Sequence, residues 1–161
     1  MTRWIALGCA LLLAGCATAP EPFTTASSQQ ALVRWNKPGQ SLVSEAVFSR
    51  SADDSVRAQL YKGSPKVLLT LSLAKSGTFN ASGPLSGLGW RGPVDSAPLG
   101  LSTWARLMQG YQNSPSWPEG ENEIHSGDAR TAVVIDKRQV RSLSVSNNLN
   151  GENITAKFRA P

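Results

Sequence analysis

The single histidine is the chain's one candidate for acid–base chemistry. His125 has carboxylates for neighbours at Glu121, Glu123 and Asp128. A carboxylate beside an imidazole can orient the ring as a general base, but a base needs a nucleophile to act on. No serine or cysteine stands in a Gly-x-Ser-x-Gly context, and a lone histidine in a charged loop is usually solvated. We therefore expect no catalytic residue and no enzyme.

Two further patterns suggest ligand chemistry but lack essential parts. Glutamates alternate over residues 119–123 without the Asp, Asn and Gly spacing of a calcium loop. Residues 87–92 spell Gly-x-Gly-x-x-Gly, but Pro93 follows and no βαβ unit does. With two cysteines and one histidine, the chain also lacks the ligands of a zinc ribbon. The sequence thus predicts no metal site and no nucleotide cofactor.

Cys16 is the residue with the most definite chemistry. Behind Arg3, residues 4–13 form an apolar run that is too short to span a bilayer and typical of a secretory signal. The run ends in Leu-Ala-Gly-Cys16, which resembles the lipobox of bacterial lipoproteins, where the cysteine after the cleavage site receives a diacylglycerol. An ordinary secretory peptide is the alternative. Cys9 is a poorer match, because almost no apolar run precedes it.

The lipobox implies a membrane anchor. We expect residues 1–15 to be a signal peptide and Cys16 to carry acyl chains such as palmitate, each buried methylene contributing about 0.8 kcal/mol. Ala17, in place of aspartate, resembles the pattern that sends lipoproteins to the outer membrane. The expected location is therefore the bacterial outer membrane, with residues 16–26 as lipidated N-terminus and flexible tether and a single domain over 27–161 facing the periplasm.

The composition suits one turn-rich β domain. The 161 residues include 14 Gly and 10 Pro, and only 17% are charged, which disfavours coiled coils and long helices. The formal charge of +5 is scattered, with one small cluster over residues 137–141. Without a dense basic stripe we expect no nucleic-acid partner, and weak attraction to anionic lipid headgroups is the better interpretation.

Alternating apolar and polar residues predict the strands. The expected strands span residues 42–50, 56–61, 66–73, 78–81, 122–126, 131–136 and 139–147, followed by a closing strand containing Ile154, Ala156 and Phe158. Asn150–Gly151 is a strong hairpin signal between the last two strands. This succession predicts an antiparallel sheet.

Two helices are expected beside the sheet. Ser27 or Ser28 can cap a short helix in which Ala31, Leu32 and Trp35 share one face, ended by Pro38–Gly39. A second helix opens at Ala97–Pro98 and ends at Gly110 or Asn113. Its amphipathic stripe consists of Leu101, Trp104, Leu107, Met108 and Tyr111. The stripe predicts that this helix covers one face of the sheet.

Residues 82–93 hold four glycines and two prolines, which is incompatible with a regular strand. The segment nevertheless contains Leu85, Leu88 and Trp90. These side chains either pack inward beneath a tight loop or protrude and contact lipid.

The order of elements resembles the family of the lipoprotein receptor LolB and the lipoprotein carrier LolA. The local pieces that carry the resemblance are Leu69–Leu73, Gly83–Gly87 before an apolar loop tip, and Pro98–Trp104. The resemblance implies a mainly β (α+β) fold: a curved antiparallel sheet or open half-barrel covered by one or two helices. It also implies an apolar trough for acyl chains, with a protruding loop that assists delivery. The implied partners are the membrane, lipid or lipoprotein acyl chains and a periplasmic carrier protein.

Two hypotheses follow for the function. In the first, the protein binds acyl chains of lipids or lipoproteins and aids their localisation. The expected cavity residues are Leu69, Leu71, Leu73, Phe79, Val133 and Ile135, the lid residues Trp104, Leu107 and Met108, and the membrane-contact residues Leu85, Leu88 and Trp90. In the second, a non-catalytic envelope lipoprotein with a solid core binds another protein through an edge strand or loop 113–120. The first requires an apolar hollow on the order of several hundred Å³, and the second requires close packing.

Overall fold

The computed structural model describes residues 22–63 and 65–160, so the expected signal peptide and Cys16 lie outside the described residues. Strands dominate the described chain. They are β1 (Thr25–Lys37), β2 (Gln40–Ser51), β3 (Val56–Tyr61), β4 (Val67–Leu73), β5 (Thr78–Ser82), β6 (Trp90–Pro93), β7 (Gly120–Ser126), β8 (Ala129–Asp136), β9 (Gln139–Asn147) and β10 (Glu152–Phe158). The helical elements are α1 (Leu99–Asn113) and the 3₁₀ turns η1 (Pro84–Ser86), η2 (Val94–Ser96) and η3 (Ser114–Ser116).

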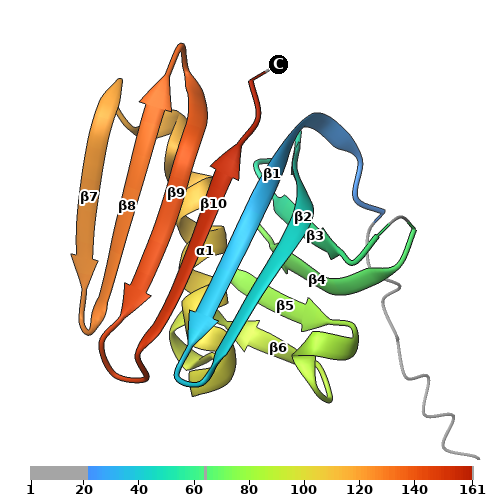
Figure 1. Ribbon diagram of the computed structural model, residues 1–161. Helices are drawn as coiled ribbons and strands as arrows, with labels where there is room; N and C mark the ends of the chain where they lie inside the picture. Colours follow the sequence, from blue (N-terminus) through green and yellow to red (C-terminus); the bar gives the residue numbers. More distant parts are fainter. Residues whose placement is uncertain (1–21, 64, 161) are drawn as a thin grey trace, which may run out of the picture.

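All ten strands form one antiparallel sheet in the order β6-β5-β4-β3-β2-β1-β10-β9-β8-β7. The first and last strands therefore pair in the middle of the sheet, and both edge strands come from the middle of the chain. The segment that joins the two edges contains α1 (Figure 1). This connection carries α1 across the sheet from one edge to the other.

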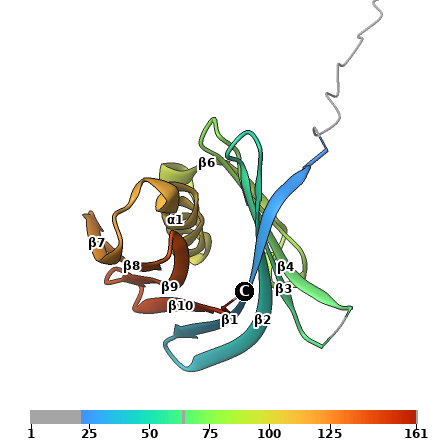
Figure 2. The ribbon, with the colours of Figure 1, turned by 90° about the horizontal axis from the view of Figure 1, so that it is seen from above.

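The sheet bends around α1, with β3–β6 on one side and β7–β10 on the other (Figure 2). The helix contacts strands of both halves, and the inward side chains of all these elements form one hydrophobic core. The sheet does not close, since β6 and β7 stand at opposite ends of the strand order. The prediction of a curved antiparallel sheet covered by a helix is confirmed. No helix among the described residues has the length and hydropathy needed to cross a bilayer.

The expected helix after Ser27 is wrong, because these residues form β1. Ala31 and Val33 are buried whereas Leu32 is 45% exposed, a period of two that a helical face cannot produce. The backbone pairs with β2 through a tight hairpin at residues 38–39, where Gly39 has a positive φ of 77°. It pairs on its other side with β10, which is more than 100 residues away in the chain, and this long-range pairing overrides the local helical pattern.

The Gly-rich segment also contains a strand that we did not expect. Residues 90–93 form β6 and pair with β5 at the edge of the sheet. An edge strand tolerates Pro93, which has no N–H to donate. A glycine is needed at position 92 for a different reason. The Trp90 ring lies over Gly92, and a Cβ there would come within 2.7 Å of the indole. The glycine thus makes room for the tryptophan.

The other predicted elements are confirmed, with strand ends that differ from expectation by at most two residues. The second expected helix is α1, and it ends at Asn113 rather than at Gly110. Gly110 lies inside the helix, on the side that faces β8 and β9. A Cβ added there would lie 3.0 Å from the side chains of Leu143 and Thr131, so a larger residue would push α1 away from β8 and β9.

Candidate functional site

The concave face of the sheet and α1 together form the interior that the first hypothesis concerns. The structure brings all nine expected cavity and lid residues into one cluster, each between 0% and 5% exposed: Leu69, Leu71, Leu73, Phe79, Val133, Ile135, Trp104, Leu107 and Met108. None of the three hollows described below is lined by a residue of α1. In this structure the helix fills the concave side of the sheet.

Arg50 holds the C-terminal end of α1 to the sheet. Its guanidinium donates hydrogen bonds to the backbone oxygens of Tyr111 (2.6 Å) and Gln112 (3.0 Å). The Tyr111 carbonyl also accepts hydrogen bonds from the backbone N–H and the Oγ of Ser114. Both carbonyls lie at the negative end of the helix dipole. Arg50 also lies over the Tyr111 ring, 5.3 Å from its centroid. Burial raises the pKa of Tyr111, and the Arg50 charge opposes that rise.

A second polar cluster holds the N-terminal half of α1. Glu152, at the start of β10, is buried and accepts hydrogen bonds from Thr103 Oγ1 (2.7 Å) and Asn150 Nδ2 (2.9 Å). Asn150 Nδ2 also donates to the Leu99 carbonyl (3.1 Å). Asn147 Nδ2 donates to Thr103 Oγ1 at 3.3 Å. Polar side chains of the sheet therefore hold the helix by hydrogen bonds in its N-terminal half and at its C-terminal end.

A hollow of about 440 Å³, the mouth, lies where the β1–β2 hairpin meets the loop after β5. It is lined by Trp35, Lys37, Gly39, Gln40, Ser41, Leu42 and Leu85. The Trp35 ring contacts the ring of Trp104 edge-on, with centroids 5.4 Å apart. The hairpin and the loop lie at the same end of the molecule (Figure 1). A pair of tryptophans thus joins the mouth to α1.

The structure separates the three expected membrane-contact residues. Leu88 is fully exposed, whereas Leu85 and Trp90 are half-buried against the core. The Trp90 ring also packs near Phe79, with centroids 6.0 Å apart. Leu85 and Trp90 therefore pack inward, whereas Leu88 projects outward. Leu88 alone presents its whole side chain to the surroundings.

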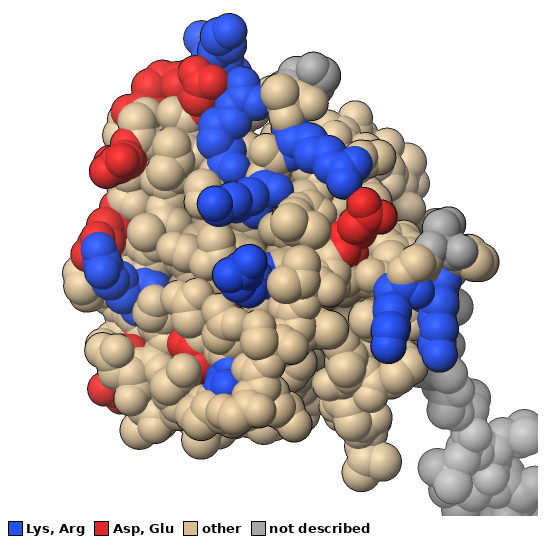
Figure 3. All heavy atoms as spheres, viewed as in Figure 1, with Lys and Arg blue, Asp and Glu red and all other residues tan. Residues whose placement is uncertain are grey.

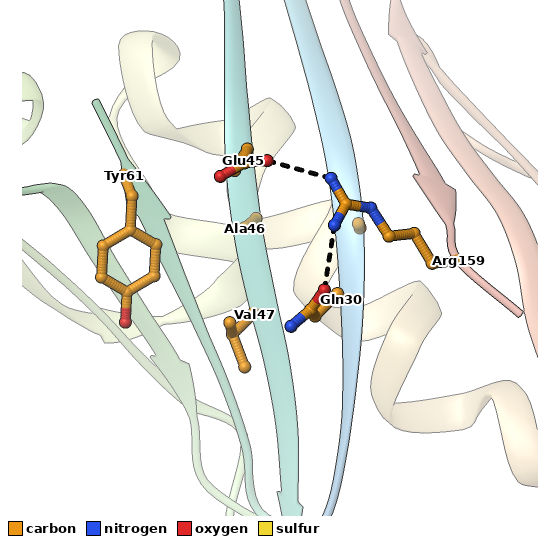
Figure 4. Close-up of a pocket in the computed structure, with 7 residues that line it drawn as sticks. Gln30, Glu45, Ala46, Val47, Tyr61 and Arg159 are labelled. Carbon is orange, nitrogen blue, oxygen red and sulfur yellow. Dashed lines mark hydrogen bonds and ion pairs between the residues drawn. The ribbon is translucent and has the colours of Figure 1, made fainter. Parts of the chain in front are cut away.

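A different hollow, of about 350 Å³, lies on the outer face of the sheet, the face directed away from α1. Figure 4 shows Arg159 reaching across it to Glu45 and Gln30. The guanidinium pairs with Glu45 at 2.9 Å and donates to the Gln30 side chain at 3.1 Å. Because the charge of Arg159 is already matched, we assign no ligand to this hollow.

His125 is exposed on β7 and pairs with Glu123, which also pairs with Arg130. The hydrogen bond from Arg130, and to a smaller extent the one with His125, holds the pKa of Glu123 below its ordinary value. The Glu123 carboxylate lies on the edge strand β7, where a charge discourages pairing with another sheet. Lys and Arg side chains are scattered over the face in Figure 3 rather than gathered in a stripe.

Sequence reasoning missed Trp35, Leu42 and Arg50 as site residues. On the expected helix Trp35 would share a face with Ala31 and Leu32. On the strand that forms instead, Trp35 alternates with Arg34 and points inward. Arg50 alternates with Phe48 on the inward face of β2, which was a usable signal for a charge directed at the interior.

No family model matches the chain, and no curated protein matches its sequence. Among solved structures, the chain is similar to a LolA superfamily protein from Nitrosomonas europaea, with a TM-score of 0.41 and 8% identity over 83% of each chain.

Proposed function

We propose that the protein is a lipoprotein anchored through Cys16 to the periplasmic face of the bacterial outer membrane, where its half-barrel binds acyl chains of lipids or lipoproteins. It would receive its cargo from a periplasmic carrier protein and aid the localisation of that cargo. Binding, rather than chemical conversion of the ligand, is the proposed activity. The interior that would hold the acyl chain is the space that α1 occupies in this structure.

One observation carries the proposal: an apolar route leads from the mouth to α1. Leu85 and Trp35 line the mouth, and the Trp35 ring contacts the ring of Trp104, while the fully exposed Leu88 stands three residues after Leu85 in the same loop. Isolated exposed leucines are common, but a leucine at the tip of the loop that lines a hollow is a suitable first contact for an alkyl chain. The route supports entry of an acyl chain between the β1–β2 hairpin and the loop after β5.

Acyl binding then requires α1 to leave part of the concave face. A single helix covers the apolar strands, and its attachments are polar groups at its two ends. An alkyl chain can replace the apolar contacts of the helix, since each buried methylene contributes about 0.8 kcal/mol. The ligand must therefore bind the open arrangement better than the closed one.

Weakening the C-terminal attachment should promote binding. Arg50→Ala removes the charge-assisted hydrogen bonds to the helix carbonyls and is expected to destabilise the closed arrangement by about 2 kcal/mol. The affinity for a fluorescent fatty-acid probe should then rise by about 10- to 30-fold. The measurement is a probe titration of the domain produced from Ala17 onward.

Gly127→Ala is the matched control for this titration. Gly127 has a positive φ of 57° in the β7–β8 turn, so alanine destabilises the fold by about 1 kcal/mol without touching α1. Its probe affinity should equal that of the unsubstituted chain. Equal gains in both variants would mean that the probe binds unfolded protein.

The complete burial of the nine interior residues favours a second candidate, an envelope interaction module with a permanently solid core. It predicts no saturable probe binding by the unsubstituted chain or by Arg50→Ala. That outcome would exclude the acyl-binding function and leave an anchored domain that binds another protein.

Leu88→Glu should impair delivery without affecting the fold. A charged group at the loop tip opposes entry into the hydrocarbon region, and we expect transfer of a bound fatty-acid probe to vesicles to slow at least tenfold. The melting temperature should stay within about 2 °C, because Leu88 buries nothing. Leu149→Glu, at another exposed leucine, should transfer the probe at the normal rate. A large loss of stability in Leu88→Glu would show instead that Leu88 packs in the core.

A further inference from the structure

Four polar side chains form a row across the outer face of the part of the sheet made of β3, β4, β5 and β6. Arg57 on β3 pairs in register with Ser72 on β4, Ser72 with Asn80 on β5, and Asn80 with Arg91 on β6. The residues on either side of each in its strand turn toward the core, so these four point outward. The row thus has an arginine at each end and neutral hydrogen-bonding groups between them.

The row lines a hollow of about 690 Å³, the largest of the three described. The N-terminal segment 22–24 and the turns at 51–55 and 74–78 form its other walls. The Phe23 ring lies against the Arg57 guanidinium, with its centroid 4.2 Å from Cζ. Stacking on an aromatic ring restricts a guanidinium while leaving its N–H groups available. Arg57 is thus held in place without being neutralised.

Neither arginine of the row has an acidic partner within residues 22–63 and 65–160. Five other arginines do make side-chain hydrogen bonds or ion pairs: Arg50, Arg106, Arg130, Arg141 and Arg159. One carboxylate lines the hollow, that of Asp53. It accepts hydrogen bonds from both Ser51 and Ser55, and these interactions hold its pKa below the ordinary value. Its oxygens are therefore engaged within their own turn.

We propose that this row binds the phosphate group of an anionic phospholipid headgroup. A guanidinium donates two parallel hydrogen bonds to phosphate oxygens, and serine and asparagine donate to the remaining oxygens. The choice of a lipid rests on the proposed anchor at Cys16. Pro22 is six positions after Cys16 in the chain, so the wall of the hollow lies within about 20 Å of the lipidated cysteine. The headgroups of neighbouring lipids are the phosphates within that reach.

The loop tip adds to this argument. Leu88 lies three residues before Arg91, and β6 is the edge strand that carries the end of the row. An apolar side chain beside a cationic row matches the boundary between acyl chains and headgroups, where lysine and arginine interact with phosphates. One edge of the sheet thus offers both groups that a membrane surface recognises.

The test measures headgroup preference rather than total lipid binding. The full lipid-anchored chain in dodecyl maltoside micelles would be titrated with dihexanoyl phosphatidylglycerol and with dihexanoyl phosphatidylcholine, and bound lipid counted by native mass spectrometry. We expect at least a tenfold preference for phosphatidylglycerol. The double variant Arg57→Gln/Arg91→Gln should reduce it below twofold, and Phe23→Ala should lower it about threefold.

Arg159→Gln is the matched control, because it removes the same charge from an arginine that is already paired on the same outer face. It should keep the full preference. A preference that survives the double variant would overturn the proposal, as would an equal loss in Arg159→Gln, which would indicate net charge alone. Displacement of phosphatidylglycerol by 10 mM inorganic phosphate would assign the row to a small free anion instead. Acyl binding in the interior would raise the uptake of both lipids equally, so its failure leaves this preference intact.

Discussion

Replacement of Trp104 by alanine is expected to lower the free energy of unfolding by about 3–5 kcal/mol, the range for truncating a fully buried tryptophan. Trp104 is 1% exposed on the inward face of α1 and contacts the ring of Trp35. Its removal leaves a cavity where the helix meets the mouth. A domain of this size is stable by about 5–15 kcal/mol, so the loss is a large share of the total. Urea denaturation followed by circular dichroism measures it.

Trp117→Ala is the control for this substitution. Trp117 is half-buried in the connection between η3 and β7, so its truncation should cost much less, about 1 kcal/mol. A loss below about 1.5 kcal/mol in Trp104→Ala would mean that α1 is not packed into the sheet in solution. The same variant bears on function, since an apolar cavity left by the indole can bind a short alkane.

Local alternation was sufficient to predict most of the sheet. In β10, Ile154, Ala156 and Phe158 face the core and the residues between them face solvent, as their pattern indicates. The antiparallel arrangement places one face of each strand on the core, which produces this signal. The stripe on α1 was equally informative because the helix buries one side only.

Local alternation could not predict which strands pair when they are far apart in the sequence. The segment around Ala31 carries both a helical and a strand signal, and its pairing with β10 decides between them. Residues 90–93 form a strand because β5 offers them an edge. The Arg57–Arg91 row depends on three registers at once, none of which the sequence specifies locally.

The interior posed a different difficulty. A hollow half-barrel and a solid core need the same apolar residues on the same strands, so Leu71 or Val133 cannot distinguish them. What distinguishes them is how closely α1 approaches the sheet. Gly110 allows that approach next to Leu143 and Thr131, and Arg50 secures the end of the helix. Both residues act through contacts that only the folded chain creates.

Cys16→Ser is expected to abolish lipid attachment and to block removal of the signal peptide. The thiol is the proposed acceptor of the diacylglycerol, and cleavage before residue 16 depends on that modification in the proposed pathway. The mature protein should therefore have the mass of residues 16–161 plus its acyl groups, whereas the variant should keep residues 1–15 and carry no lipid. Intact-mass spectrometry of membrane extracts measures both at once.

Cys9→Ser is the matched control, because Cys9 lies inside the apolar run and should be removed with the signal. This variant should be cleaved and lipidated normally. An ordinary secretory peptide predicts the opposite pattern: the Cys16→Ser chain would be cleaved as usual, and the unsubstituted protein would carry a free thiol without lipid. That pattern would remove the anchor, and with it the reason to place a lipid headgroup at the Arg57–Arg91 row, while leaving the fold of residues 22–160 and the acyl-probe titration unaffected.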